Sequence, residues 1–124
     1  MCLNNMRLEG SFYKINNIKQ IEDSYKIEVE LFANHPIYKG HFPQQAVVPG
    51  VCTLTVIREC IGIILDRVVA FESIKECKYV TALIPHENLK IIINITIVDG
   101  VKVNSIVERA DDQQIVLKLK ASLK

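Results

Sequence analysis

The sequence predicts an α+β fold in which an antiparallel β-sheet wraps around one long central α-helix. Several segments alternate apolar and polar residues, as half-buried strands do. One segment, near residues 50–66, carries apolar residues on nearly all of its faces. A helix of that kind has to be enclosed, and strands are the only elements that the rest of the chain offers for this. The dipeptide Asp99-Gly100 between two alternating segments is typical of a tight antiparallel hairpin.

Two strands are expected before the helix. A weak one lies within residues 11–21 and ends at the turn formed by residues 22–24. The second covers residues 25–31, where tyrosine, isoleucine, valine and leucine alternate with lysine and glutamate. This alternation indicates one buried and one solvated face.

Four strands are expected after the helix. Residues 74–81 form a mixed segment, with Cys77, Tyr79 and Thr81 on the face opposite Val80. The segment Leu89–Ile97 places five branched apolar side chains on one face, and residues 101–107 continue beyond the hairpin. The last strand covers residues 115–123, where apolar residues alternate with lysines.

Composition bounds the class of protein. The chain has 124 residues, 49% apolar and 23% charged, which predicts one globular domain over residues 1–124. A net charge of +1 argues against a nucleic-acid partner. The first ten residues show no signal peptide, and no apolar stretch reaches the roughly 18 residues of a membrane span. Four cysteines without CxxC spacing indicate reduced thiols in a cytoplasmic protein, and three scattered histidines predict no metal site.

The most informative stretch covers residues 35–51. It contains two motifs, Gly40-His41-Phe42-Pro43 and Val48-Pro49-Gly50-Val51. The prolines fix φ, and the glycines permit tight backbone geometry. The arrangement brings a histidine, which titrates near neutral pH, close to the positive end of a helix dipole. A base beside backbone N–H groups that stabilise an anion suits acyl-thioester chemistry.

This stretch, together with the order of the elements, resembles the hotdog-fold 3-hydroxyacyl-[acyl carrier protein] dehydratases. The pattern His-Pro-x-Tyr-x-Gly-His-Phe-Pro and the following Pro-Gly-Val carry the resemblance. It implies a hotdog fold, with His41 as the catalytic histidine and no cofactor. It also implies that the N–H groups of Gly50 and Val51 polarise the thioester carbonyl. An acyl carrier protein would be the partner, and a dimer would place His41 of one subunit against the helix of the other.

One position departs from the family. The family carries an acidic residue on the helix, fourteen positions after its catalytic histidine, and this chain has Thr55 there. A threonine hydroxyl is a poor general acid near neutral pH, and it can instead bond the carbonyl four residues earlier. Glu59 lies one turn further on and is the candidate substitute acid. The alternative for Glu59 is a salt bridge at a subunit contact.

Three functions therefore stay open. The first is dehydration of a 3-hydroxyacyl thioester in fatty-acid or related polyene synthesis, with His41, Thr55 and Glu59 as the catalytic candidates. The second is a non-catalytic subunit that binds acyl carrier protein in a hetero-oligomer, whose partner would supply the missing acid. The third is a thioesterase, for which Glu59 is the candidate carboxylate.

Overall fold

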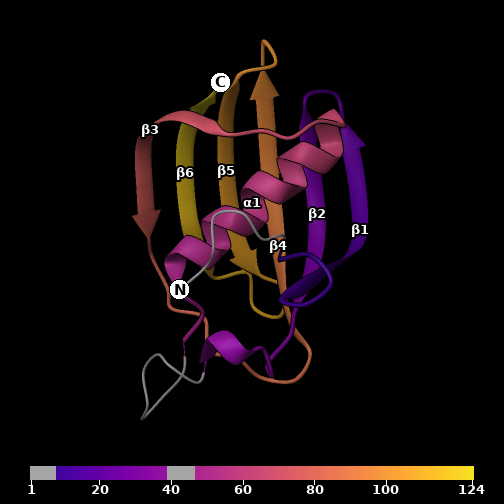
Figure 1. Cartoon of the computed structure of the whole chain (residues 1–124), viewed down its shortest axis with the longest axis vertical. Coiled ribbons are helices and arrows are strands. Elements are labelled where there is room, and N and C mark those ends of the chain that lie inside the picture. The colour runs from indigo at the N-terminus through magenta and orange to yellow at the C-terminus, as the bar shows by residue number, and fades with distance from the viewer. Residues whose placement is uncertain (1–7, 39–46) are drawn as a thin grey trace.

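The computed structural model describes residues 8–38 and 47–124 of the chain. In chain order the elements are β1 (Tyr13–Ile21), β2 (Ser24–Leu31), the short 3-10 helix η1 (Pro36–Tyr38), α1 (Gly50–Leu65), β3 (Phe71–Tyr79), β4 (Leu89–Val98), β5 (Lys102–Arg109) and β6 (Ile115–Leu123). The strands form one six-stranded sheet in the order β1-β2-β4-β5-β6-β3, and α1 crosses one of its faces (Figure 1). The predicted hotdog architecture, a sheet around one helix, is confirmed.

All strand pairs are antiparallel. The predicted hairpin joins β4 to β5. In its turn, the N–H of Val101 donates to the carbonyl of Val98 at 3.2 Å. Asp99 and Gly100 have φ values of 56° and 72°, the left-handed pair that a mirror-image turn requires. Because this turn twists as the strands do, it fixes the register between β4 and β5.

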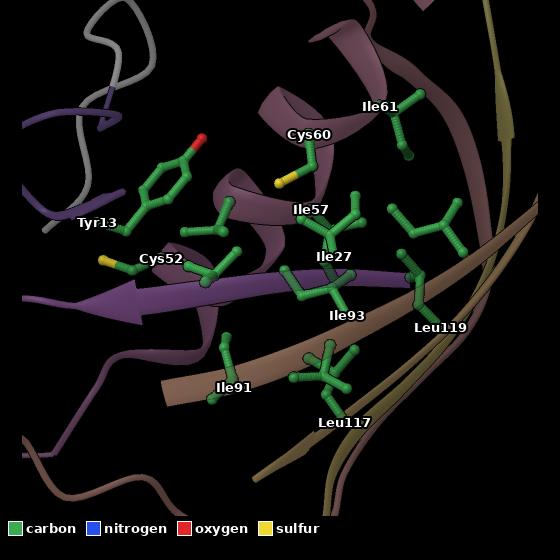
Figure 2. Packing of buried hydrophobic residues seen from close by; sticks show 14 of the residues in the cluster. Tyr13, Ile27, Cys52, Ile57, Cys60, Ile61, Ile91, Ile93, Leu117 and Leu119 are labelled. Carbon is green, nitrogen blue, oxygen red and sulfur yellow. The ribbon is translucent and has the colours of Figure 1, made fainter. Parts of the chain in front are cut away.

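The core lies between α1 and the concave face of the sheet (Figure 2). Strand residues alternate between the core and the opposite face of the sheet, as the sequence predicts. In β4, for example, every second residue from Leu89 to Ile97 is buried. The strand residues without exposed surface include Ile27, Val29, Ile91, Ile93, Val107 and Leu117. They pack against the helix residues Cys52, Val56, Ile57, Cys60 and Ile61, which are also fully buried.

The two faces of α1 differ in burial. Residues on its sheet side are buried, whereas Leu54, Ile63 and Ile64 are half-buried and Val51 is 53% exposed. The expected enclosure of the helix is therefore complete on the sheet side and incomplete on the outer face. The last residue of the helix is Leu65, one residue before the predicted boundary, because the left-handed backbone of Asp66 (φ 55°) stops it.

The cysteines correct one expectation. Cys60 and Cys77 carry free thiols, as predicted. Cys52 is disulfide-bonded. The prediction of four reduced thiols is therefore wrong for Cys52. Within residues 8–38 and 47–124, no helix has the length and hydropathy to cross a membrane.

Candidate active site

The first turn of α1 presents two N–H groups that its own helix does not use. Pro49 has an extended backbone (φ −62°, ψ 139°) and gives no side-chain cap. Its carbonyl accepts from the N–H groups of Cys52 and Thr53, at 3.0 and 3.3 Å. No described residue accepts a hydrogen bond from the N–H groups of Gly50 or Val51. These groups carry the positive end of the helix dipole, so an oxygen with negative charge would be stabilised there.

A pocket of about 420 Å³ opens against this turn. Its lining residues are Val48, Gly50, Val51, Thr53, Tyr79, Val80, Thr81, Ala82, Leu83 and Val116. The volume falls in the ~300–1,000 Å³ range of small-molecule sites. The walls are mainly aliphatic, with hydroxyl groups from two threonines and one tyrosine, and the described lining residues include no charged side chain. Such a lining suits a neutral, largely apolar ligand.

Two segments distant in sequence are joined to form this pocket. The N–H of Val48, just before α1, donates to the carbonyl of Leu83 at 2.8 Å. The N–H of Val80, just after β3, donates to the carbonyl of Val116 at 2.9 Å. The end of β3 is thereby held beside the start of α1, so the pocket depends on long-range contacts rather than on one motif.

Tyr79 closes the pocket over the helix start. A Cβ added at residue 50 would lie 2.5 Å from Cε1 of Tyr79, 2.7 Å from its Cζ and 2.9 Å from its hydroxyl oxygen. The ring can take this place only because residue 50 is glycine. Tyr79 pairs with Leu117 on β6, so its side chain lies on the helix side of the sheet. The sequence interpretation assigned no role to Tyr79; the only available signal was its place on one face of the mixed 74–81 segment.

Thr55 uses its hydroxyl group within its own helix. The hydroxyl donates to the carbonyl of Val51 at 2.9 Å, which is the i−4 bond considered as an alternative from the sequence. The side chain is half-buried and one turn away from the uncapped N–H groups. Because its proton is engaged, the Thr55 oxygen is available mainly as an acceptor.

Glu59 is a buried carboxylate, 7% exposed, that holds the N-terminal segment. Its Oε2 accepts from the N–H of Leu8 at 2.9 Å, and its Oε1 accepts from the N–H of Glu9 at 3.1 Å and from the hydroxyl of Tyr13 at 3.0 Å. Burial, together with the neighbouring Cys60 and Glu59, raises the pKa of Tyr13, so its hydroxyl stays a donor. The described partners of Glu59 are thus N–H and O–H groups, and Glu59 does not line the pocket. Figure 2 shows Tyr13 with its hydroxyl directed toward the helix.

Two of the three histidines, His35 and His86, lie within the described residues. His35 stacks edge-on against Phe12, with ring centroids 5.4 Å apart, and burial lowers its pKa. His86 is exposed, and its Nδ1 lies 2.9 Å from the carbonyl of Glu87. His41 lies outside the described residues, as do its motif neighbours Gly40, Phe42 and Pro43. In the part of the chain that the structure describes, no group of His, Cys, Asp and Glu side chains could hold a metal ion.

Comparison with known proteins finds a family and relatives that this chain matches. Residues 17–120 match the model of the ApeI-like family, described as ApeI dehydratase. A 3-hydroxyacyl-[acyl-carrier-protein] dehydratase, FabZ, from Macrococcus caseolyticus is 24% identical over 98 residues, which cover 72% of this chain and 68% of that protein.

Solved structures share the fold. The dehydratase heterocomplex ApeI:P from Xenorhabdus doucetiae matches with a TM-score of 0.75 at 20% identity, covering 88% of this chain and 95% of the other. A putative thioesterase, yhdA, from Lactococcus lactis matches with a TM-score of 0.62 at 10% identity, covering 91% of both chains.

Proposed function

The chain belongs to the ApeI-like dehydratase family, and on that premise we propose that it removes water from a 3-hydroxyacyl thioester carried by acyl carrier protein. The product would be a trans-2-enoyl thioester, in fatty-acid or related polyene synthesis. The observation that carries the proposal is the pocket against the N–H groups of Gly50 and Val51: among the described residues, none accepts from these groups and no charged side chain lines the pocket. A neutral thioester would enter this pocket with its carbonyl oxygen at the helix start.

The helix start would act on the carbonyl oxygen. Removal of the proton from the α-carbon leaves negative charge on that oxygen, in an enolate-like state. The N–H groups of Gly50 and Val51 would donate to the oxygen, and the helix dipole would favour the charge. Each such donor commonly changes kcat by about 10²–10³-fold.

His41 is the proposed base, on the strength of its motif. In its neutral form it would take the α-proton, and the electron pair of the broken C–H bond would form the new double bond as the bond from the β-carbon to oxygen breaks. The departing hydroxyl needs a proton to leave as water. Protonated His41 would return the proton that it removed, so no separate acid is required.

Thr55 and Glu59 would assist differently. The Thr55 oxygen, whose own proton is donated to Val51, would accept a hydrogen bond from the β-hydroxyl or from a water and so orient it. Glu59 is already engaged by two N–H groups and one phenol. We therefore propose that Glu59 attaches the N-terminal segment to α1. Proton transfer by Glu59 is the alternative, and its variants test it.

A subunit role is the second candidate. The similar ApeI:P structure is described as a heterocomplex, and Thr55 stands where the resemblance to the dehydratases implies an acidic residue. The half-buried outer face of α1 and the exposed side chain of Val51 would then be covered by a partner. Assembly with a second hotdog chain, or as a homodimer, would complete the site.

Incubating the purified protein with 3-hydroxyacyl-acyl carrier protein tests these functions together. We expect enoyl thioester to form and the acyl chain to stay on its carrier. Release of free thiol without enoyl product would instead favour a thioesterase, and activity only after a co-encoded hotdog partner is added would favour the subunit role. An inert protein in every combination would contradict the proposal.

Thr55→Glu tests the missing acid. Thr55 is half-buried rather than enclosed, so a carboxylate there keeps access to water and should not unfold the protein. A carboxyl group in this position can cycle protons, and we expect kcat for dehydration to rise by up to about 10²-fold. Thr55→Val is the matched control, since it keeps the shape and removes the hydroxyl. An unchanged kcat in Thr55→Glu, with folding and oligomeric state preserved, would exclude this position from proton transfer.

A further inference from the structure

We propose that Tyr79 is a catalytic residue of this site and the third hydrogen-bond donor to the thioester carbonyl oxygen. The proposal rests on the proposed function, since it assumes that the thioester occupies the pocket at the start of α1. It goes beyond that function because the mechanism above uses only two backbone N–H groups, and no side chain, as donors to the carbonyl oxygen. Tyr79 is brought to them by the tertiary structure rather than by a motif.

Position is the first argument. The Tyr79 hydroxyl oxygen lies 2.9 Å from where a Cβ of Gly50 would stand, and that point is one bond from the Gly50 Cα. Gly50 begins α1, so the phenol hydroxyl lies over the first turn, on the side where the pocket opens. An oxygen that accepts from the Gly50 N–H sits about 2.9 Å from that nitrogen. An oxygen bound there and the Tyr79 hydroxyl would thus both lie beside the first turn of α1.

The chemical state of the phenol is the second argument. Partial burial, and then the neighbouring Cys77 thiol, raises the pKa of Tyr79 to about 12. A group whose pKa is raised keeps its proton below that value, so Tyr79 remains a neutral donor throughout the physiological pH range. A thioester oxygen that gains negative charge would be a strong acceptor for this O–H group.

Access is the third argument. Tyr79 is 54% exposed although it lies on the helix side of the sheet. The ring thus forms part of the pocket wall, while one side of it remains open to an entering ligand. A tyrosine that served only as a wall would need its ring and not its hydroxyl. Phenylalanine at this position therefore separates the two roles.

Tyr79→Phe is the decisive variant, with Tyr25→Phe as its matched control. Tyr25 lies on β2, partly buried against the core, and does not line the pocket. We expect Tyr79→Phe to lower kcat by about 10–10²-fold with little change in KM, because the donor acts on charge that develops in the transition state. Tyr25→Phe should leave both constants unchanged. Equal kcat values for Tyr79→Phe and the parent would overturn the proposal.

Gly50→Ala tests the role of Tyr79 in a second, independent way. The added methyl group would overlap the ring, and the exposed ring can swing away, so folding should persist while kcat falls. In a double-mutant cycle the Gly50→Ala change should cost much less in the Tyr79→Phe background, because the donor is already gone. Fully additive losses would show that the two residues act separately and would count against the proposal.

A binding measurement keeps the test separate from turnover. The infrared carbonyl band of a bound crotonyl-pantetheine thioester, labelled with ¹³C, should lie at higher frequency in His41→Ala/Tyr79→Phe than in His41→Ala, since one donor is lost. A shift without any dehydration in the parent would refute the proposed reaction and sustain the role of Tyr79. Turnover in the parent with no shift would refute Tyr79 alone, and failure of the parent to bind the thioester would refute both.

Discussion

Replacement of His41 by alanine is expected to lower kcat for dehydration by about 10²–10⁴-fold, the usual contribution of a positioned base. His41 is the proposed group that removes the α-proton and returns it to the departing hydroxyl, so both halves of the elimination lose their proton carrier. KM should change little, because the backbone N–H groups of Gly50 and Val51 and the pocket still hold the thioester. Steady-state kinetics with a 3-hydroxyacyl thioester measures both constants.

The control for this variant is His86→Ala. His86 is exposed, and its ring contacts only the neighbouring Glu87 carbonyl among the bonds described for it. We expect wild-type kinetics from His86→Ala and an unchanged thermal unfolding midpoint from both variants. If His41→Ala stays folded and keeps the parent's kcat, His41 has no part in the reaction. Chemical rescue by added imidazole would further support a missing base rather than a disturbed loop.

Local patterns were enough to predict most of the fold. Alternation in β4 has one physical meaning, because a one-residue slip would move every isoleucine from the core to solvent. The pair Asp99-Gly100 likewise adopts the positive φ values that its turn requires. The helix was predicted to within one residue at its C-terminal end, where the left-handed Asp66 ends it.

The helix start at Gly50 was predicted from local sequence, and its role as a binding site stays a prediction. Gly50 and Val51 adjoin Pro49 in sequence, so the uncapped helix start follows from the motif itself. Tyr79 reaches Gly50 through the pairing of β3 with β6, and no spacing in the sequence encodes that approach. The incomplete cover of the outer face of α1 was missed for a similar reason, since an all-round apolar helix does not reveal which of its faces a single chain leaves partly open.

Glu59 illustrates the limit most clearly. From the sequence it was a substitute acid or half of a salt bridge, because helix periodicity gives its direction and not its partners. Its hydrogen-bond partners lie 46 to 51 residues away along the chain, at Leu8, Glu9 and Tyr13. Charge-assisted bonds from N–H groups to a buried carboxylate are among the stronger ones in proteins. This contact therefore joins the start of the described chain to the centre of α1.

Glu59→Ala is accordingly expected to lower the free energy of unfolding by about 3 kcal/mol, since buried donors left without an acceptor cost about 1–3 kcal/mol each. Leu8 is 5% exposed and Tyr13 is fully buried, so water cannot readily replace the carboxylate. Tyr13→Phe removes one donor and keeps the carboxylate, and should cost about 1 kcal/mol. Urea denaturation measures these losses, and Glu87→Ala, which removes an exposed carboxylate, should leave the free energy of unfolding unchanged.

Glu59→Gln then separates stability from catalysis. The amide keeps one acceptor oxygen, so the loss of stability should be smaller than in Glu59→Ala, although its NH₂ group faces donors. If Glu59 holds the helix, kcat per folded molecule should stay within about threefold of the parent, because the reacting proton is carried by His41. A loss of about 10²-fold or more in a folded Glu59→Gln protein would instead make Glu59 the general acid. The N-terminal segment would then have to release the carboxylate during turnover, because both of its oxygens accept hydrogen bonds from that segment.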